Sequence, residues 1–560
     1  MRQIAVTALV CALLPGLAPG QLTPDQKISD FQHLAGLYAK HYAPYEWKRD
    51  VSGFDLMEIT PWLNKVAATR SDLEFYDVMS AYVASLNDAH DAYSLPSNFN
   101  TTLNFSVDVY DGVLLVDSIN RTRLPGSEFP FMNGYELVSI DGVAAEKLLE
   151  TFLRYNIAAN DRSTRRFAAA LLTVRPQWVM PFAPDVPEIS TVVFRRPDGS
   201  TESHRIPWTR TGLPLATVGR YAAPLAAGAG DAEGAPDYIE PLNRLQNCQL
   251  LDRGVLSFGD NEPIFAASLG ANFTLRLGRQ SSDGFYSGIF DYGPYKIGFI
   301  RIPSFSPNDP AGAVTSFFQE VRYFQGKTDG LIVDVMRNPG GSVSYAGQLL
   351  SLLLPSRWSA VGFEIRASSG WVASISSSLE SAKAQGAPPL IIAQLQGIKD
   401  AIVTANHELR GRTGPVPLIG LTIDQEPLTD PSGAPYAYTK PLMLLTDELS
   451  ASAADMFAAT IQDNSRGTLF GWRTMGAGGS VTSWAAGSYS QGSVSMTESL
   501  MTRSREVITP EFPATRYIEN VGVRPDIEAD YMTRDNLNRG GAAFVDAFLK
   551  AMSERIANGK

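Results

Sequence analysis

The chain is poor in the side chains that most often build metal sites and covalent cross-links. Its 560 residues contain two cysteines and five histidines. Cys11 lies in an apolar N-terminal stretch, so that Cys248 stands alone in the mature chain and an intrachain disulfide is excluded. No cluster of histidine and cysteine has metal-ligand spacing, and the sequence therefore implies no metal and no organic cofactor.

Basic runs and long apolar segments are also missing. The formal net charge is -11, and loss of Arg2 with the N-terminal stretch would make it one unit more negative. An acidic chain without a basic run excludes nucleic acids and anionic membranes as expected partners. Beyond residue 20, no apolar run is long enough to predict a membrane span.

The first 20 residues have the pattern of a secretory signal peptide. Arg2 is followed by an apolar run from Ile4 to Leu14 and by the small residues Ala18 and Gly20. We expect cleavage before Gln21, and thus an exported protein that is periplasmic or extracellular.

The hydrophobic periodicity changes several times along the chain, which has enough apolar residues for several cores. The changes predict a signal peptide (1–20), an N-terminal helical region (21–100), a β-rich module (104–208), an insertion or linker (209–290), a core (291–535) and a C-terminal helix (536–560). Strands alternate with helices in the core, which predicts an α/β fold there.

The segment Leu449-Ser450-Ala451-Ser452-Ala453 places a serine between a buried strand and a helix. Unpaired backbone N–H groups and the positive end of the helix field surround such a position, and they can stabilise an oxyanion. Helix capping is the alternative role, because serine is a preferred N-cap residue.

This segment resembles the nucleophile segment of the tail-specific (C-terminal processing) serine peptidases, and three more of their motifs follow in the expected order. They are a first core strand at 297–305, a strand and glycine loop at 330–341, and a Gly-Val-x-Pro-Asp turn at 519–526. The resemblance implies a β-α spiral (crotonase-like) peptidase core. Residues 134–143 resemble the hallmark of a PDZ domain, a module that takes a peptide as an added strand.

The usual base of the bacterial tail-specific branch is absent. Its lysine position falls on Ala477, and no other lysine lies between Ser452 and Lys550. A second branch, which contains the tricorn protease core and the chlamydial protease-like activity factor, uses a histidine. The turn around His90 follows a helical pattern and resembles that branch, which implies that His90 is the general base for Ser452.

The resemblance also implies the remaining site residues. Glu519, next to the closing turn, is expected to orient His90, with Asp88 and Asp91 as alternatives. Gly340 or Gly341 is expected to form the oxyanion hole together with Ala453. The other four histidines are expected to be structural.

The sequence thus predicts an exported serine endopeptidase that acts on proteins or peptides through an acyl-enzyme. The resemblance allows a homodimer, and it places residues 209–260 where the chlamydial factor carries a segment that blocks its active site until self-cleavage. The alternative is a catalytically inactive member that binds peptides or hydrophobic ligands, as the interphotoreceptor retinoid-binding proteins do. Separation of His90 and Glu519 from Ser452 beyond hydrogen-bond reach would favour that alternative.

Overall fold

The computed structural model describes residues 21–155, 157–216, 236–250, 255–280 and 282–559. The predicted signal peptide, residues 1–20, lies outside the described residues.

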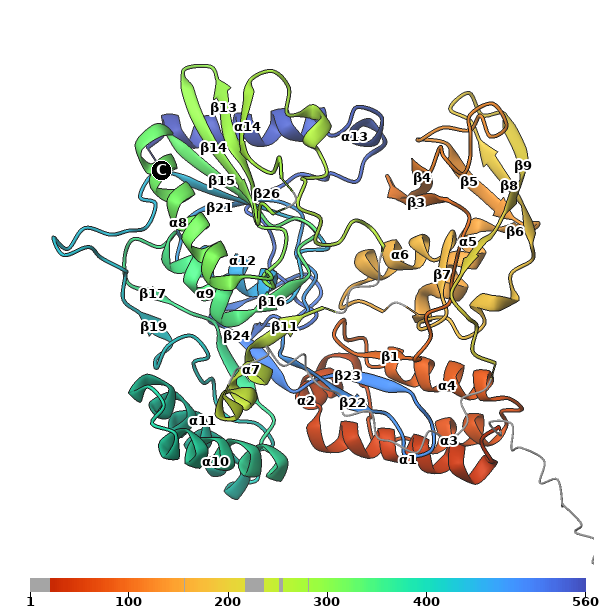
Figure 1. Ribbon diagram of the computed structural model, residues 1–560, viewed down its shortest axis with the longest axis horizontal. Coiled ribbons are helices and arrows are strands. Elements are labelled where there is room, and N and C mark those ends of the chain that lie inside the picture. The colour runs from red at the N-terminus through yellow and green to blue at the C-terminus, as the bar shows by residue number, and fades with distance from the viewer. Residues whose placement is uncertain (1–20, 156, 217–235, 251–254, 281, 560) are drawn as a thin grey trace, which may run out of the picture.

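Four helices form the N-terminal region, in red and orange in Figure 1: α1 (Pro24–His41), α2 (Tyr45–Ser52), α3 (Thr60–Ala67) and α4 (Asp72–Ala84). Phe31, Leu34 and Tyr38 repeat at helical spacing on α1 and are completely buried. A hairpin from the far end of the chain, β22 (Val481–Ala485) and β23 (Ser493–Thr497), lies beside these helices and pairs with β1 (Ala92–Ser94). The N-terminal region is therefore joined to the C-terminal half of the chain.

The β-rich module contains an antiparallel sheet of β3 (Phe105–Tyr110), β4 (Val113–Ile119), β5 (Glu136–Ile140), β8 (Ile189–Arg195) and β9 (Thr201–Pro207), with β6 (Val143–Ala144) at β5. Helices α5 (Ala145–Phe152) and α6 (Asp161–Ala170) belong to the same module. Between β5 and β6, Asp141 and Gly142 both have positive φ, as a tight hairpin turn requires.

A seven-stranded sheet forms the centre of the peptidase core. Its order is β12 (Phe273–Leu277), β13 (Tyr286–Tyr292), β14 (Tyr295–Arg301), β15 (Gly330–Asp334), β20 (Leu442–Thr446), β21 (Thr468–Gly471) and β26 (Ile527–Glu528). The strands from β14 onward run parallel. The predicted α/β class is confirmed. The sheet begins ahead of residue 291, because β12 and β13 belong to it.

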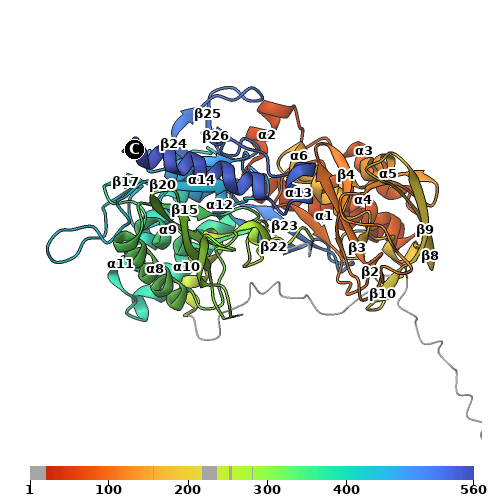
Figure 2. The ribbon, with the colours of Figure 1, turned by 90° about the horizontal axis from the view of Figure 1, so that it is seen from above.

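Helices cover both faces of this sheet. α8 (Pro310–Lys327), α9 (Val343–Ser351) and α12 (Ala453–Asp463) share one hydrophobic core with inward side chains of the strands, and α14 (Ala542–Ala557) covers the opposite face. Figure 2 shows α14 on the side away from α8 and α9. The carboxyl ends of β15 and β20 lead into the glycine loop and the serine loop, the edge at which α/β proteins usually bind ligands.

Smaller elements complete the described chain. They are β2 (Asn100–Thr102), β7 (Val174–Pro176), β10 (Thr209–Thr211), α7 (Glu240–Gln246), β11 (Asn247–Gln249), β16 (Gly340–Ser342), β17 (Trp358–Ser359), β18 (Gly362–Ile365), α10 (Ser369–Ala384), α11 (Pro389–His407), β19 (Asp424–Gln425), β24 (Ser499–Val507), β25 (Thr515–Tyr517), α13 (Arg534–Asn538) and four short 3₁₀ segments.

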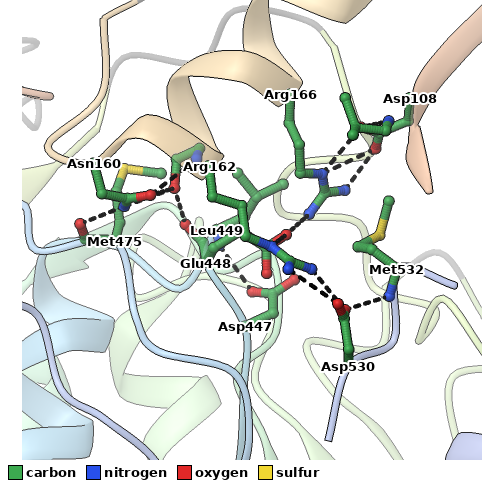
Figure 3. Close-up of polar contacts among 12 residues, drawn as sticks. Asp108, Asn160, Arg162, Arg166, Asp447, Glu448, Leu449, Met475, Asp530 and Met532 are labelled. Carbon is green, nitrogen blue, oxygen red and sulfur yellow. Dashed lines mark hydrogen bonds and ion pairs between the residues drawn. The ribbon is translucent and has the colours of Figure 1, made fainter. Parts of the chain in front are cut away.

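A buried group of charges joins the β-rich module to the core (Figure 3). Arg166 of α6 bonds the carboxylate of Asp108 at 2.6 Å and that of Glu448 at 3.0 Å, and its side chain is 1% exposed. Arg162, one turn earlier, bonds Glu448 at 2.8 Å and Asp530 at 2.6 Å. Because Glu448 lies in the loop that precedes Ser452, this group anchors that loop from outside the core.

Replacement of Arg166 by methionine should destabilise the chain strongly. The buried carboxylates of Asp108 and Glu448 would lose their shared cation, at a cost of about 3–5 kcal/mol. Arg195→Met is the matched control, because its pair with Glu136 is 43% and 26% exposed and contributes about 0–1 kcal/mol. Chemical denaturation followed by tryptophan fluorescence measures both, and equal losses would contradict the anchoring role.

Candidate active site

Ser452 occupies a strained position at the start of α12. Its backbone has φ 62° and ψ -111°, a conformation that costs free energy for any residue with a side chain. The residue is completely buried. The turn places the serine hydroxyl at the carboxyl edge of the sheet, next to the first N–H groups of the helix.

The carboxylate of Asp455 holds this turn in place. It accepts the backbone N–H of Ser452 at 2.7 Å and those of Gly476 and Ala477 at 2.9 and 3.1 Å, and it also accepts the hydroxyl of Thr474. Burial raises the pKa of Asp455 to about 6, while these hydrogen bonds favour its charged form. Asp455 thus joins the serine turn to the segment that contains Ala477.

The structure brings His90 to Ser452. The imidazole Nε2 lies 2.7 Å from the Ser452 hydroxyl, and both side chains are buried. Asp88 accepts the backbone N–H of His90 at 3.0 Å, and Ser495 of β23 donates to the His90 carbonyl oxygen at 2.5 Å. Burial lowers the pKa of His90 to about 4, so the imidazole is neutral at physiological pH.

No described residue bonds the other ring nitrogen, Nδ1, of His90. Asp88 accepts the hydroxyl of Tyr42 at 3.1 Å through its second oxygen, and Asp91 accepts the backbone N–H of Thr497 at 3.0 Å. Burial and the charge of Asp88 raise the pKa of Asp91 well above its usual range. Neither aspartate therefore orients the imidazole through a direct bond.

Glu519 is completely buried nearby and is paired with a lysine. Its carboxylate accepts the Lys48 ammonium at 2.5 Å and the Gly478 N–H at 2.9 Å. Lys48 also donates to the carbonyl oxygen of Asn87, at the turn before His90, at 2.8 Å. Glu519 thus reaches the His90 turn through Lys48 and forms no direct bond with the imidazole. Burial and the charge of Asp88 raise the pKa of Glu519 to about 7, against the opposing effect of Lys48.

Lys48 is a site residue that the sequence did not indicate. It lies on the short helix α2 and is 2% exposed. A lysine beside another basic residue usually marks a solvated helix face. Its burial depends on long-range contacts with Glu519 and Asn520, which no local pattern reports.

The glycine loop lies directly against Ser452. Gly340 and Gly341 have φ of 88° and 140°, and a Cβ on Gly340 would lie 2.7 Å from the Cβ of Ser452. Only glycine permits this approach. The Gly340 N–H donates to the side-chain oxygen of Asn338 at 2.8 Å. Ala453 is the first residue of α12, where the backbone N–H has no partner inside the helix.

A strand from the predicted insertion pairs with this loop. In the antiparallel pair of β11 and β16, Cys248 faces Gly341 and Gln249 faces Gly340, and the Leu250 N–H donates to the Pro339 carbonyl oxygen at 2.8 Å. This register directs the Cys248 carbonyl oxygen to the Gly341 N–H. Burial raises the pKa of the Cys248 thiol well above its usual range, and a hydrogen bond with Ser452 acts against that shift.

The described residues hold no group of histidine, cysteine, aspartate and glutamate side chains arranged to bind a metal ion. Within the same part of the chain, no helix has the length and hydropathy needed to cross a membrane.

Two of the other histidines have partners of their own. His41 stacks on Trp484, and His204 contacts Glu202.

Two regions of the chain match known protein families. Residues 296–529 match the model of peptidase family S41, and residues 100–214 match that of a PDZ domain. A relative from Chlamydia pneumoniae is 26% identical over 92% of this chain and 88% of its own length. One from Chlamydia trachomatis is 25% identical over 95% of this chain and 93% of its own.

The fold is also found among solved structures. The structure described as mature CPAF complexed with lactacystin has a TM-score of 0.73 and 22% identity, and the match covers 96% of this chain and 99% of that one. At this identity the likeness concerns the fold alone. The chain is a serine peptidase: residues 296–529 are similar to peptidase family S41, and a PDZ domain precedes this region.

Proposed function

We propose that the protein is an exported endopeptidase in which Ser452 is the nucleophile and His90 the general base. The observation that carries the proposal is the 2.7 Å contact between His90 Nε2 and the Ser452 hydroxyl, beside a glycine loop and a helix start. A neutral imidazole at this distance can accept the hydroxyl proton.

The reaction follows from this geometry. Ser452 attacks the peptide carbonyl while His90 takes its proton, and the oxyanion is held by the N–H groups of Ala453 and Gly341. Gly341 is favoured over Gly340, since the Gly340 N–H donates to Asn338 within the loop, whereas the Gly341 N–H faces Cys248 of the strand that is proposed to block the site. The imidazolium then gives its proton to the leaving amine, and water releases the acyl group from Ser452.

Glu519 is proposed to support His90 indirectly. Its bond to Lys48, and that of Lys48 to the Asn87 carbonyl, hold the turn before the histidine. The Glu519 carboxylate also offsets the positive charge of the Lys48 ammonium. Without this offset, the ammonium would disfavour protonation of His90 in the buried site. Glu519 is therefore a positioning residue in this scheme.

The rival function, an inactive binding protein, is less well supported. It expects His90 and Glu519 to lie apart from Ser452. Glu519 bonds Lys48 and not the imidazole, but His90 and Ser452 are in hydrogen-bond contact. The strained φ of Ser452 points the same way, because such strain is usually retained where a reaction needs it. Export and a homodimer remain predictions from the sequence.

We also propose that residues 247–250 block the site until the chain is cleaved between residues 209 and 260. The pairing of β11 with β16 supports this proposal, since the strand lies where a substrate would meet Gly341 and Ser452.

In the chain cleaved between residues 209 and 260, substitution of Ser452 or His90 by alanine should abolish hydrolysis of casein, because nucleophile and base act as a unit. We expect losses of about 10⁴-fold or more. Glu519→Gln should cost about 10- to 100-fold, since it removes a charge without a direct bond to His90. His33→Ala is the matched control and should keep full activity. Full activity in His90→Ala would identify another base.

The His90 imidazole should stay neutral down to about pH 4 in the intact chain. The pKa of His90 in the folded chain lies below the ordinary value of 6.5, so the unfolded chain takes up the proton at a higher pH than the folded chain does. The stability of the fold therefore falls as the pH is lowered from 6.5 to about 4. Carbon-13 NMR of labelled histidines measures the titration, and His90→Gln assigns the signal. A midpoint above pH 6 would contradict the buried environment.

Limited proteolysis between residues 209 and 260 should expose Ser452. A fluorophosphonate probe should label the cleaved chain at least about tenfold faster than the intact chain, because the β11–β16 pair must open first. Ser452→Ala provides the blank. Equal labelling rates before and after cleavage would refute the block.

A further inference from the structure

We infer that the pocket filled by Leu250 is a substrate subsite for an aliphatic side chain, two positions along the strand from Cys248, which faces Gly341. The inference rests on the proposed function and names its substrate class. Leu250 is 1% exposed and shares a hydrophobic cluster with Ala89, Leu449 and Ala451. Ala89 precedes His90, and Ala451 precedes Ser452, so this cluster borders both reacting groups.

The binding mode of residues 247–250 is that of an added strand. In such binding, main-chain hydrogen bonds set the register and alternate side chains enter pockets. Cys248 and Leu250 are buried, whereas Asn247 and Gln249 are exposed. The Gln249 side chain accepts the Ser306 hydroxyl at 2.9 Å at the outer side. Leu250 is therefore a pocket-filling side chain of a strand held as a substrate would be.

The chemistry of the pocket selects an uncharged, medium-sized side chain. The cluster around Leu250 is built from alanines together with Phe167, Met475, Leu449 and Val255. A charged group placed among these residues would lose its water without gaining a partner. The small alanine side chains leave room for leucine, isoleucine, valine or methionine.

Backbone hydrogen bonds hold one residue of the pocket wall, Met475. Its N–H donates to the Ser450 carbonyl oxygen at 2.9 Å, and its carbonyl oxygen accepts the Asn160 side chain at 2.8 Å (Figure 3). The neighbouring Ala477 N–H is fixed by Asp455. The pocket is thus built on the same anchored segments that position Ser452.

The first test measures how firmly Leu250 holds its strand. In the full chain, Leu250→Asp should raise the rate of Ser452 labelling by a fluorophosphonate probe about tenfold or more, because a buried unpaired charge expels the strand. Gln249→Asp is the matched control: it adds the same charge one residue away, on the exposed side, and should change the rate less than about twofold. Equal acceleration in both variants, or none in Leu250→Asp, would overturn the inference.

The second test reads the preference from products. The Leu250→Asp chain digests casein, and mass spectrometry identifies the cleaved bonds. We expect leucine, isoleucine, valine or methionine to be enriched at one fixed position near the cleaved bond. Ala477→Met, which narrows the pocket, should shift that position to alanine and glycine.

Hydrolysis that depends on Ser452 but shows no aliphatic preference, or a preference unchanged by Ala477→Met, would refute the subsite and leave the peptidase intact. Absence of Ser452-dependent hydrolysis would refute the proposed function itself. Even without hydrolysis, the comparison of probe labelling rates between Leu250→Asp and Gln249→Asp decides whether the pocket holds Leu250.

Discussion

The site depends on one buried carboxylate, that of Asp455. It accepts three backbone N–H groups and one hydroxyl from two separate segments, and so fixes both the serine turn and the wall that carries Ala477. These hydrogen bonds stabilise the strained positive φ of Ser452, because an isolated residue would relax from that conformation. Without this carboxylate, neither Ser452 nor the segment that carries Ala477 would have a defined position.

Buried charge is distributed around the site in pairs. Lys48 is matched by Glu519, and the Arg166 guanidinium by Asp108 and Glu448. Burial of an ion without a partner costs several kcal/mol, so each pair ties together the segments that supply its members. The N-terminal helices and the β-rich module are thereby locked to loops of the peptidase domain, which explains how parts remote in sequence form one centre.

Much of this arrangement could be predicted from the sequence. The α/β class followed from the alternation of apolar runs, and Ser452, His90 and the glycine loop were predicted from motifs that resemble those of the tail-specific serine peptidases. Lys48 and the strand at Cys248 could not be predicted. Their roles arise from contacts with residues far along the chain, and three residues are too few to show a strand period. The bond of Glu519 to Lys48, in place of His90, depends on the same long-range packing.

The two side chains proposed to react, His90 and Ser452, lie 362 positions apart in the sequence. The region that matches peptidase family S41, residues 296–529, therefore contains the proposed nucleophile without its proposed base. In evolutionary terms, the proposed mechanism makes the helical region at the N-terminus a part of the catalytic unit, and not an exchangeable accessory module. During synthesis, the contact between His90 and Ser452 can form only after most of the chain has left the ribosome.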